Sequence, residues 1–337
     1  MKKKIIFSAG GTGGHILPAL NLMKHLSVKG YKVLLVTDKR GTNFISKYPD
    51  FKSYILKTST PTKKNILNKL ISLFIILYSI IKSIFILKKE KPDLVFGFGG
   101  YASFPICFAS KIFNLPLFIY ENNIVFGRAN KILSIFSKKI FLSKKFSKNF
   151  PHKYIKKIHE VGPILEKKII NYLPKKQSNE KNLFSVLILG GSQGAKIFGE
   201  VVPNVISLIK NEGYEIEVIQ QCLRNQKNSI IEFYKEKNIK NYVFEFEEDI
   251  LQLILSANLA ITRSGASSLA ELNYTKTPFI AVPLPDSIDN HQFLNAQYYE
   301  NNSCCWLLEQ KNFNKKNLFN LIIKNMKEKN ILNNMCK

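Results

Sequence analysis

Cysteine is scarce in this chain of 337 residues. There are five cysteines, no two of them form a C-x-x-C, and only Cys304 and Cys305 are adjacent. This usage excludes a disulfide framework and a cysteine-rich zinc site, and it favours a reducing compartment. An apolar fraction of 45% is too high for a disordered chain, and the length is typical of two domains.

Acidic residues are also few. The chain has 24 Asp and Glu against 50 Lys and Arg, which gives a formal net charge of +26. Such an excess points to an anionic partner, namely nucleic acid, acidic lipid or a phosphorylated substrate. Only four of the cations are arginine, the side chain that base-edge recognition favours. Compositional drift toward lysine explains much of the charge equally well, and we expect no nucleic-acid partner.

Paired acidic ligands are missing. No two of the six aspartates form a D-x-D, the kind of acidic pair that often holds Mg²⁺ beside a nucleotide. The one acidic cluster, residues 247–249, is expected to cap a helix that begins at Ile250. The sequence therefore predicts no metal site, and a diphosphate would rest on backbone N–H groups at helix N-termini. A Walker lysine pattern and a nucleophile elbow are absent as well, so a covalent mechanism has no obvious nucleophile.

Long uncharged apolar runs are limited to one segment, residues 66–87. Its longest charge-free stretch is residues 70–81, whereas a membrane span needs about 20 apolar residues. The basic start at residues 1–4 is followed by too few apolar residues for a signal peptide. Apolar residues surround the whole helical wheel of 66–87, which leaves a core helix or an interfacial helix as alternatives. Flanking lysines favour the interfacial helix, docked on an anionic membrane surface.

One pattern occurs twice, 180 residues apart. A short apolar strand leads into a glycine loop and then into a helix, first at residues 5–29 and again at residues 184–210. The loops read GGTGGH (10–15) and GGSQGA (190–195), and the first helix is expected to begin at Ile16. This repeated β–loop–α opening predicts an α/β protein made of two tandem Rossmann-like domains with parallel sheets.

The domain boundary is expected near residue 162, before a stretch rich in Pro, Lys and Asn. We predict domains 1–162 and 163–337. Two further strands, residues 93–98 and 258–262, also run into glycine-containing loops. Because ligands bind at the carboxyl ends of parallel strands, the four loops predict a cleft between the domains.

His15 directly follows the first glycine loop. The positive end of the helix dipole keeps its imidazole neutral, so a general base is favoured over a histidine that only satisfies loop backbone groups. The loop fails the dinucleotide fingerprint at Ile16, and Asp38 is interpreted as a polar strand end rather than a ribose ligand. These features argue against an NAD(P)-dependent dehydrogenase.

Two later helix starts carry polar residues. Glu271 follows a small-residue loop, where it either binds ribose hydroxyls or is an ordinary glutamate favoured by the helix dipole. Asp289 and Gln292 are expected to form a capping box.

Four motifs together resemble one family. They are GGTGGH at 10–15, KPDLVFGFGGY at 91–101, GGSQGA at 190–195 and RSGASSLAEL at 263–272. In this order and spacing they resemble the MurG family of UDP-N-acetylglucosamine-dependent N-acetylglucosaminyltransferases. The resemblance implies a GT-B fold and an inverting, metal-independent transfer that uses no cofactor. GlcNAc would move from UDP-GlcNAc to the 4-hydroxyl of the MurNAc of lipid I, giving lipid II in peptidoglycan synthesis. It also implies a peripheral protein on the cytoplasmic face of the bacterial inner membrane.

The resemblance also implies roles for individual residues. His15 is the catalytic base, Glu271 holds the ribose, and Gln292 reads the GlcNAc hydroxyls. The N-terminal half takes the lipid acceptor, with Tyr101 and Glu121 on the acceptor side, and the C-terminal half takes the donor. The residues implied in donor binding are Thr12, Gly13, Gly14, Asn123, Ser192, Gln193, Gly194, Arg263, Ala266, Glu271 and Gln292.

The chain departs from the family pattern in three places. The family's His-Glu-Gln-Asn is replaced by Tyr-Glu-Asn-Asn at 120–123, and its junction arginine is absent from Gly162–Glu166, with Lys167 or Lys168 as substitutes. The family's last helix packs on the first domain, and residues 317–326 are a candidate for a shortened version. Alternative functions are another GT-B enzyme, such as a glycolipid glycosyltransferase or a sugar-nucleotide epimerase, and a non-catalytic protein of the membrane surface.

Overall fold

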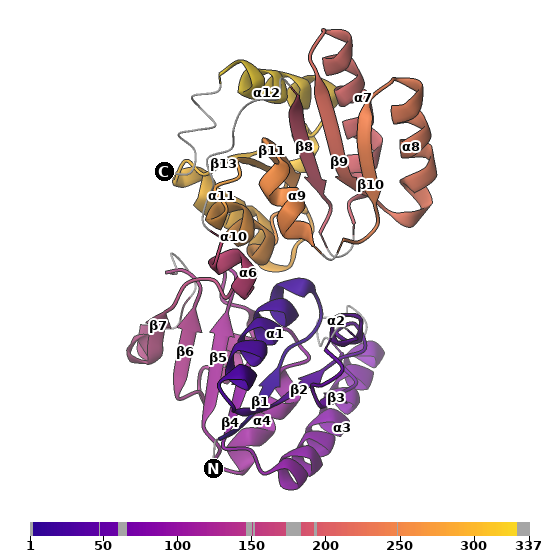
Figure 1. Cartoon of the computed structure of the whole chain (residues 1–337). Helices are drawn as coiled ribbons and strands as arrows, with labels where there is room; N and C mark the ends of the chain where they lie inside the picture. The colour runs from indigo at the N-terminus through magenta and orange to yellow at the C-terminus, as the bar shows by residue number, and fades with distance from the viewer. Residues whose placement is uncertain are drawn as a thin grey trace. The chain divides into compact units, whose positions relative to one another are not determined.

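The computed structural model describes residues 3–46, 48–59, 66–145, 150, 152–172, 183–191, 194–247 and 249–328. The chain divides into two units, Met1–Glu166 and Lys167–Lys337 (Figure 1). Each unit is a parallel sheet covered by helices, so the predicted pair of Rossmann-like α/β units is confirmed.

The first unit contains a seven-stranded sheet of order β3-β2-β1-β4-β5-β6-β7. Its strands are β1 (Lys4–Ser8), β2 (Lys32–Thr37), β3 (Ser53–Ile55), β4 (Leu94–Gly97), β5 (Leu117–Glu121), β6 (Lys139–Leu142) and β7 (Ile158–Glu160). All neighbouring strands are parallel, and Phe7 of β1 pairs with Leu35 of β2 and Phe96 of β4. The inner strands are nearly continuous apolar runs because both faces of the sheet are covered.

Helices form the two outer layers of this unit. They are α1 (Gly13–Val28), α2 (Thr42–Ile45), α3 (Ile66–Glu90), α4 (Phe104–Ile112), α5 (Arg128–Leu133) and the 3₁₀ turn η1 (His152–Lys157). One core cluster joins α1 to the sheet, and another joins α3, α4 and α5 to it. The first helix begins at Gly13 rather than at Ile16, because the backbone N–H groups of His15 and Ile16 both donate to the carbonyl of Thr12.

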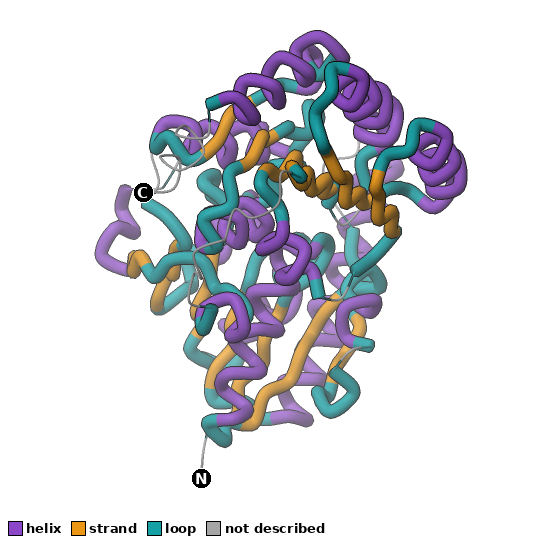
Figure 2. The backbone as a smooth tube through the Cα atoms, turned by 45° about the horizontal axis from the view of Figure 1, so that its top comes forward, coloured by secondary structure: helices purple, strands orange, loops and turns teal. Residues whose placement is uncertain are grey.

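The second unit contains a six-stranded sheet of order β10-β9-β8-β11-β12-β13, seen as twisted orange strands in Figure 2. Its strands are β8 (Phe184–Leu189), β9 (Ile216–Gln221), β10 (Lys240–Phe244), β11 (Leu259–Thr262), β12 (Phe279–Ala281) and β13 (Cys305–Leu307). All of its neighbouring strands are parallel too.

The helices of the second unit begin with α6 (Lys167–Ile170) and α7 (Lys196–Asn211). The others are α8 (Lys227–Glu236), α9 (Ile250–Ser256), α10 (Ala266–Tyr274), α11 (His291–Asn301) and α12 (Lys315–Lys327), with 3₁₀ turns η2 (Arg224–Gln226), η3 (Ile288–Asn290) and η4 (Gln310–Asn312). The described part of the last helix, α12, contributes Leu318 and Ile322 to the core of this second unit, where they pack with α7.

Candidate functional site

The first glycine loop connects the carboxyl end of β1 to α1. Gly11 has a φ of +84°, a conformation that glycine adopts without strain. Thr12 is the N-cap of α1 but makes no side-chain capping bond, and the first turn contains no acidic residue. The start of α1 therefore presents the positive end of the helix dipole, and His15 lies in this first turn.

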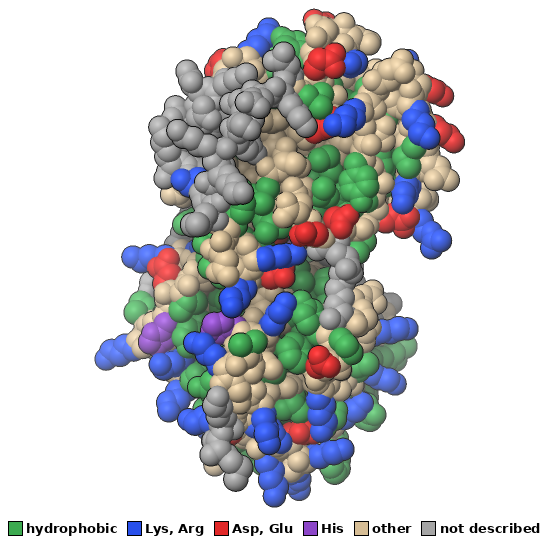
Figure 3. Space-filling model, in the orientation of Figure 1, with side chains coloured by type: hydrophobic (Ala, Val, Ile, Leu, Met, Phe, Trp, Pro, Cys, Tyr) green, Lys and Arg blue, Asp and Glu red, His purple; other side chains and the backbone are tan. Residues whose placement is uncertain are grey.

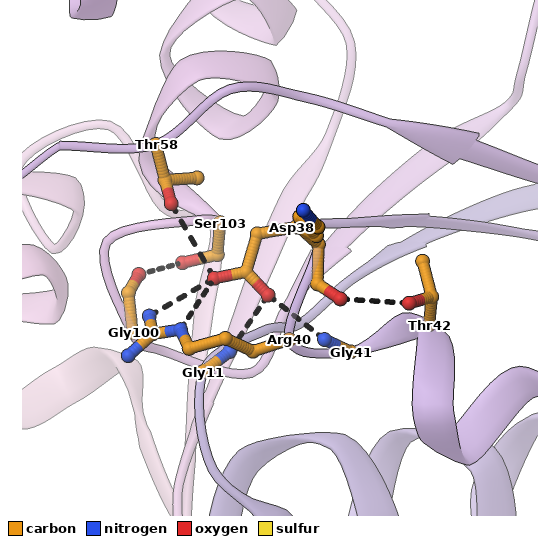
Figure 4. Close-up of polar contacts among 9 residues, drawn as sticks. Gly11, Asp38, Arg40, Gly41, Thr42, Thr58, Gly100 and Ser103 are labelled. Carbon is orange, nitrogen blue, oxygen red and sulfur yellow. Dashed lines mark hydrogen bonds and ion pairs between the residues drawn. The ribbon is translucent and has the colours of Figure 1, made fainter.

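Asp38, directly after β2, anchors this loop through its carboxylate (Figure 4). Its buried carboxylate accepts hydrogen bonds from the backbone N–H groups of Gly11 at 3.2 Å and Gly41 at 3.0 Å, and from Nη2 of Arg40 at 2.9 Å. Burial by itself would raise the pKa of Asp38, but the hydrogen bonds from Arg40, Gly11 and Gly41 lower it below its usual value. The carboxylate is thus a structural partner of the loop, as the interpretation of a polar strand end predicts.

The imidazole of His15 lies against the glycines that follow β4. Gly99 and Gly100 have φ values of +81° and +73°. A Cβ atom at Gly99 would lie 3.2 Å from Nδ1 of His15, and one at Gly100 would lie 3.3 Å from Cδ2 of His15 and 3.0 Å from the carbonyl oxygen of Gly10. The first two of the four motifs therefore meet, and glycine backbone forms the surface on which the imidazole rests.

Glu121 shapes the turn after β5. Its carboxylate is buried and accepts from the backbone N–H of Gly127 at 3.0 Å and from Nδ2 of Asn130 at 2.9 Å. It also accepts from both the backbone N–H and Nδ2 of Asn123, at 3.1 Å each. Glu121 and Asn123 are therefore brought together, with the carboxylate turned into the protein. Tyr101 is half-buried in the turn between β4 and α4.

Asn122 and Asn130 are functional candidates that the sequence reasoning missed. Nδ2 of Asn122 donates to the carbonyl oxygen of Gly14 at 3.0 Å. Nδ2 of Asn130 donates to the carbonyl oxygen of Tyr120 at 3.2 Å and lies 3.3 Å from where a Cβ of Gly99 would be. The sequence does show two consecutive asparagines, Asn122 and Asn123, directly after a buried strand, which is where site residues are expected in a parallel sheet.

The second glycine loop connects β8 to α7. Gly191 and Gly194 have φ values of +76° and +69°, and the N–H of Gly194 donates to the carbonyl of Gly191 at 3.0 Å. A Cβ at Gly190 would lie 2.6 Å from the backbone nitrogen of Ala195, so the loop closes tightly in front of α7. The first turn of α7 contains no acidic residue, as suits an anion site. The predicted donor residues Ser192 and Gln193 lie outside the described residues.

Arg263, after β11, directs its guanidinium into the protein. Nη1 donates to the carbonyl oxygens of Val282 at 3.2 Å and Pro283 at 3.3 Å, and Nη2 donates to Oε1 of Gln310 at 2.6 Å. The residue is buried, and burial lowers the pKa of its guanidinium from the usual value. Arg263 thus holds together the loops after β11, β12 and β13.

Gln292 joins two of the same loops. Its Oε1 accepts from the backbone N–H of Ser264 at 3.2 Å and from that of Leu284 at 3.0 Å. Glu271 lies in the second turn of α10 and is half-buried, and Ala266 is buried at the first position of that helix. A Cβ at Gly265 would meet no atom within 4 Å, so the backbone in front of α10 is open.

One of the two predicted helix caps is wrong. Asp289 is not the N-cap of α11, because Asp289 and Asn290 both take left-handed conformations and Asn290 becomes the cap, without a side-chain capping bond. Gln292 consequently bonds elsewhere. Asp249 is the N-cap of α9, which begins at Ile250 as predicted, although the Asp249 side chain makes no capping bond and instead pairs with Nζ of Lys168 at 3.0 Å.

No group of three or more His, Cys, Asp or Glu side chains that could hold a metal ion occurs within the described ranges.

The α3 surface, residues 66–90, reverses the usual pattern of a helix in a folded domain, because small polar residues are buried and many apolar residues are exposed. Ser72, Ser79 and Ser83 are fully buried, whereas most of the large apolar side chains are exposed, apart from those that reach the core near the end of the helix, such as Ile86 and Leu87. The Oγ of Ser79 donates to the carbonyl of Lys57 at 2.6 Å, so small polar residues fasten the helix to the unit. Exposed apolar residues are Ile66, Leu67, Leu70, Ile71, Leu73, Phe74, Leu77, Tyr78, Ile81 and Phe85. A core helix does not account for this exposure.

By length and composition alone, α3 could also cross a membrane, and among the described residues no other helix passes that test. Only 28% of its most apolar 18-residue stretch is buried. The face of the first unit seen in Figure 3 carries many basic and few acidic side chains.

Comparison with known proteins agrees with this architecture. Residues 5–142 match the glycosyltransferase family 28 N-terminal domain, and residues 185–337 match the glycosyltransferase family 28 C-terminal domain. The chain is 39% identical over 327 residues to a protein of Pelagibacter ubique, covering 96% of this chain and 89% of that protein. It is 37% identical over 323 residues to a protein of the Wolbachia of Culex pipiens, covering 95% and 88%. Both are named UDP-N-acetylglucosamine–N-acetylmuramyl-(pentapeptide) pyrophosphoryl-undecaprenol N-acetylglucosamine transferase.

Solved structures give the same result. The chain resembles MurG of Acinetobacter baumannii with a TM-score of 0.78 at 25% identity, covering 100% of this chain and 94% of that one. A putative UDP-N-acetylglucosamine 2-epimerase of Listeria monocytogenes has a TM-score of 0.70 at 13% identity, covering 100% of this chain and 91% of that one, and shares the fold alone. The predicted GT-B architecture is confirmed, and the chain belongs to glycosyltransferase family 28 and, within it, to the MurG family.

Proposed function

We propose that this enzyme uses His15 as the general base when it transfers GlcNAc from UDP-GlcNAc to the 4-hydroxyl of the MurNAc of lipid I, giving lipid II. As a member of its family, the chain is a UDP-GlcNAc-dependent N-acetylglucosaminyltransferase of peptidoglycan synthesis. The observation that supports the role of His15 is its place in the first turn of α1, against Gly99 and Gly100.

The chemistry follows from an inverting displacement. His15 accepts the proton of the acceptor hydroxyl while the hydroxyl oxygen bonds to C1 of GlcNAc. The bond from C1 to the UDP oxygen breaks on the opposite face, and UDP leaves with the electron pair. Backbone N–H groups of the second glycine loop and at the start of α7 stabilise the charge that develops on the leaving diphosphate.

The donor site has its largest part in the second unit. Glu271 would hold the ribose hydroxyls, and the residues around the start of α10 would meet the nucleotide and sugar. We propose as donor residues Thr12, Gly13, Gly14, Asn123, Ser192, Gln193, Gly194, Ala266, Glu271 and Gln292, with Arg263 supporting their loops. Tyr101 would line the acceptor side, and Glu121 would position that turn.

The α3 surface supports peripheral attachment to an anionic membrane on its cytoplasmic side, which brings the enzyme to its lipid-linked acceptor. Lys69, Lys82, Lys88 and Lys89 are exposed on the same helix and suit anionic headgroups. A docked rather than spanning helix fits best, because the buried serines and Glu90 tie α3 to the first unit. No role for nucleic acid is proposed.

Replacing His15 by alanine tests the proposal. With labelled UDP-GlcNAc and lipid I, the label should enter the lipid fraction about 10²–10⁴-fold more slowly than in the wild type. UDP affinity, measured by calorimetry, should hardly change. His25→Ala in the last turn of the same helix is the matched control and should retain wild-type turnover. Wild-type turnover in His15→Ala would refute the assignment, and label found only in an epimerised sugar nucleotide would indicate another reaction.

A further inference from the structure

Tyr120 is fully buried in β5, and its hydroxyl lies among several polar groups. Oη lies 3.1 Å from Oδ1 of Asn122 and 3.3 Å from the carbonyl oxygen of Gly162, and it accepts from the backbone N–H of Ile164 at 3.2 Å. Gly162 and Ile164 belong to the last segment of the first unit. The phenol therefore joins β5 to the segment that leads out of the unit.

The contact with Asn122 leads directly to the proposed base. Nδ2 of Asn122 donates to the carbonyl oxygen of Gly14 at 3.0 Å, and Gly14 immediately precedes His15 in the first turn of α1. The backbone carbonyl of Asn122 is held in turn by Oγ of Ser143 at 2.7 Å. A continuous chain of hydrogen bonds thus runs from Tyr120 through Asn122 to the turn that carries His15.

The hydrogen bonds from Tyr120 to Gly14 all run in one direction, because the Tyr120 hydroxyl donates to Asn122 and the Asn122 amide donates to Gly14. An amide side chain presents one acceptor and one donor group, so a hydroxyl that donates to Oδ1 leaves Nδ2 to face the Gly14 carbonyl. Burial raises the pKa of Tyr120 well above its usual value, with a further contribution from the neighbouring Glu121, so the phenol remains a donor at neutral pH.

We propose that Tyr120 is a positioning residue for His15, acting through the Asn122 amide and the Gly14 carbonyl. This inference rests on the proposed role of His15 as the base. Phenylalanine at position 120 would fill the same space but remove the donor that orients the amide. The first turn of α1 would then lose a fixed partner, and a small displacement of a base is costly to the rate.

Tyr120→Phe tests this, with Tyr234→Phe as a matched control. Tyr234 is also fully buried, and its hydroxyl donates to another side-chain amide, Oε1 of Gln220, at 2.6 Å in the second unit. Both variants should lower the melting temperature similarly. Only Tyr120→Phe should lower kcat, by about 10-fold or more, with KM for UDP-GlcNAc and the affinity for UDP within twofold of wild type.

A double-mutant cycle adds a second measurement. If Tyr120 acts through Asn122, then Tyr120→Phe combined with Asn122→Ala should reduce kcat little further than Asn122→Ala alone. Independent multiplicative losses would overturn the inference, as would a kcat in Tyr120→Phe equal to that of Tyr234→Phe. His15→Ala in the same assay distinguishes failure of the proposed base from failure of the positioning role. If His15→Ala retains wild-type turnover, the general-base role has failed. If it loses turnover while Tyr120→Phe does not, only the positioning role has failed.

Discussion

The guanidinium of Arg263 stacks on the ring of Phe198, with Cζ 5.1 Å from the ring centroid. Phe198 lies in the first turn of α7, and a Cβ at Gly191 would lie 3.8 Å from Cβ of Arg263. The second glycine loop is therefore supported by a residue from a neighbouring strand end. Stacking of this kind contributes roughly 0.5–2 kcal/mol, depending on how far the cation is desolvated.

Arg263→Met should lower the free energy of unfolding by about 2–4 kcal/mol, because the carbonyls of Val282 and Pro283 lose a charged donor. Chemical denaturation measures this loss. Arg263→Lys should recover only part of it, since an ammonium lacks the planar fork. Unchanged stability with a large loss of UDP affinity would instead make Arg263 a direct nucleotide contact.

Glu271→Gln should weaken the binding of UDP and of UDP-GlcNAc alike, by ~1.5–3 kcal/mol, the scale of a hydrogen bond to a charged group. Isothermal titration calorimetry gives both affinities. Glu236→Gln, an exposed glutamate of α8, is the control and should bind UDP normally. Equal UDP affinity in Glu271→Gln and the wild type would reject the ribose role.

Glu90 at the end of α3 should make the first unit sensitive to acid. Burial alone would raise its pKa, but hydrogen bonds from Lys52, Tyr54 and Lys4 hold it at about 2, below the usual 4.5. A lowered pKa contributes stability that is fully present above pH 4.5 and is lost as the pH falls through about 2. The contribution is at most about 3 kcal/mol.

Urea unfolding of the wild type and of Glu90→Gln at pH 7 and pH 3 measures this effect. The difference in unfolding free energy should be large at pH 7 and smaller at pH 3. An equal difference at both pH values would show that the carboxylate does not carry the acid sensitivity.

The double change Phe74→Ser and Leu77→Ser should reduce flotation with vesicles of phosphatidylethanolamine and phosphatidylglycerol. Both side chains are more than half exposed on α3. The melting temperature should change little, because exposed positions contribute little to folding. Leu208→Ser on α7 is the control, an exposed leucine in the second unit.

Salt should remove only part of the vesicle binding, since each lysine near the surface adds ~1 kcal/mol while the apolar face is insensitive to ionic strength. Normal flotation of the double variant, with a marked loss of thermal stability, would assign the α3 surface to packing instead.

Chelation by EDTA should leave the transfer reaction largely intact, because backbone N–H groups at helix starts can carry the diphosphate. The measurement is the initial rate with and without EDTA at fixed lipid composition. Complete loss of activity that returns with Mg²⁺ would contradict this, whereas a partial stimulation by Mg²⁺ is compatible with cation binding to the lipid headgroups.

Local pattern was enough to predict the architecture. Apolar runs followed by glycine loops and amphipathic segments predict parallel strands and helices, because strand and helix periodicities are local properties of the chain. The two glycine loops and the place of His15 at the start of α1 follow from the same signals. The helix start differs by three residues, since the carbonyl of Thr12 accepts two bonds that sequence cannot show.

Only the tertiary structure decided where polar side chains point. The amide of Asn122 reaches Gly14 across 108 positions of sequence, and Arg263 reaches Gln310 across 47. The serines of α3 face inward because small hydroxyls can meet nearby carbonyls, including that of Lys57, which leaves large apolar residues outside. Residues so far apart in sequence leave no periodic pattern that could reveal their pairing. Buried polar groups need hydrogen-bond partners, and only the folded chain brings these partners together.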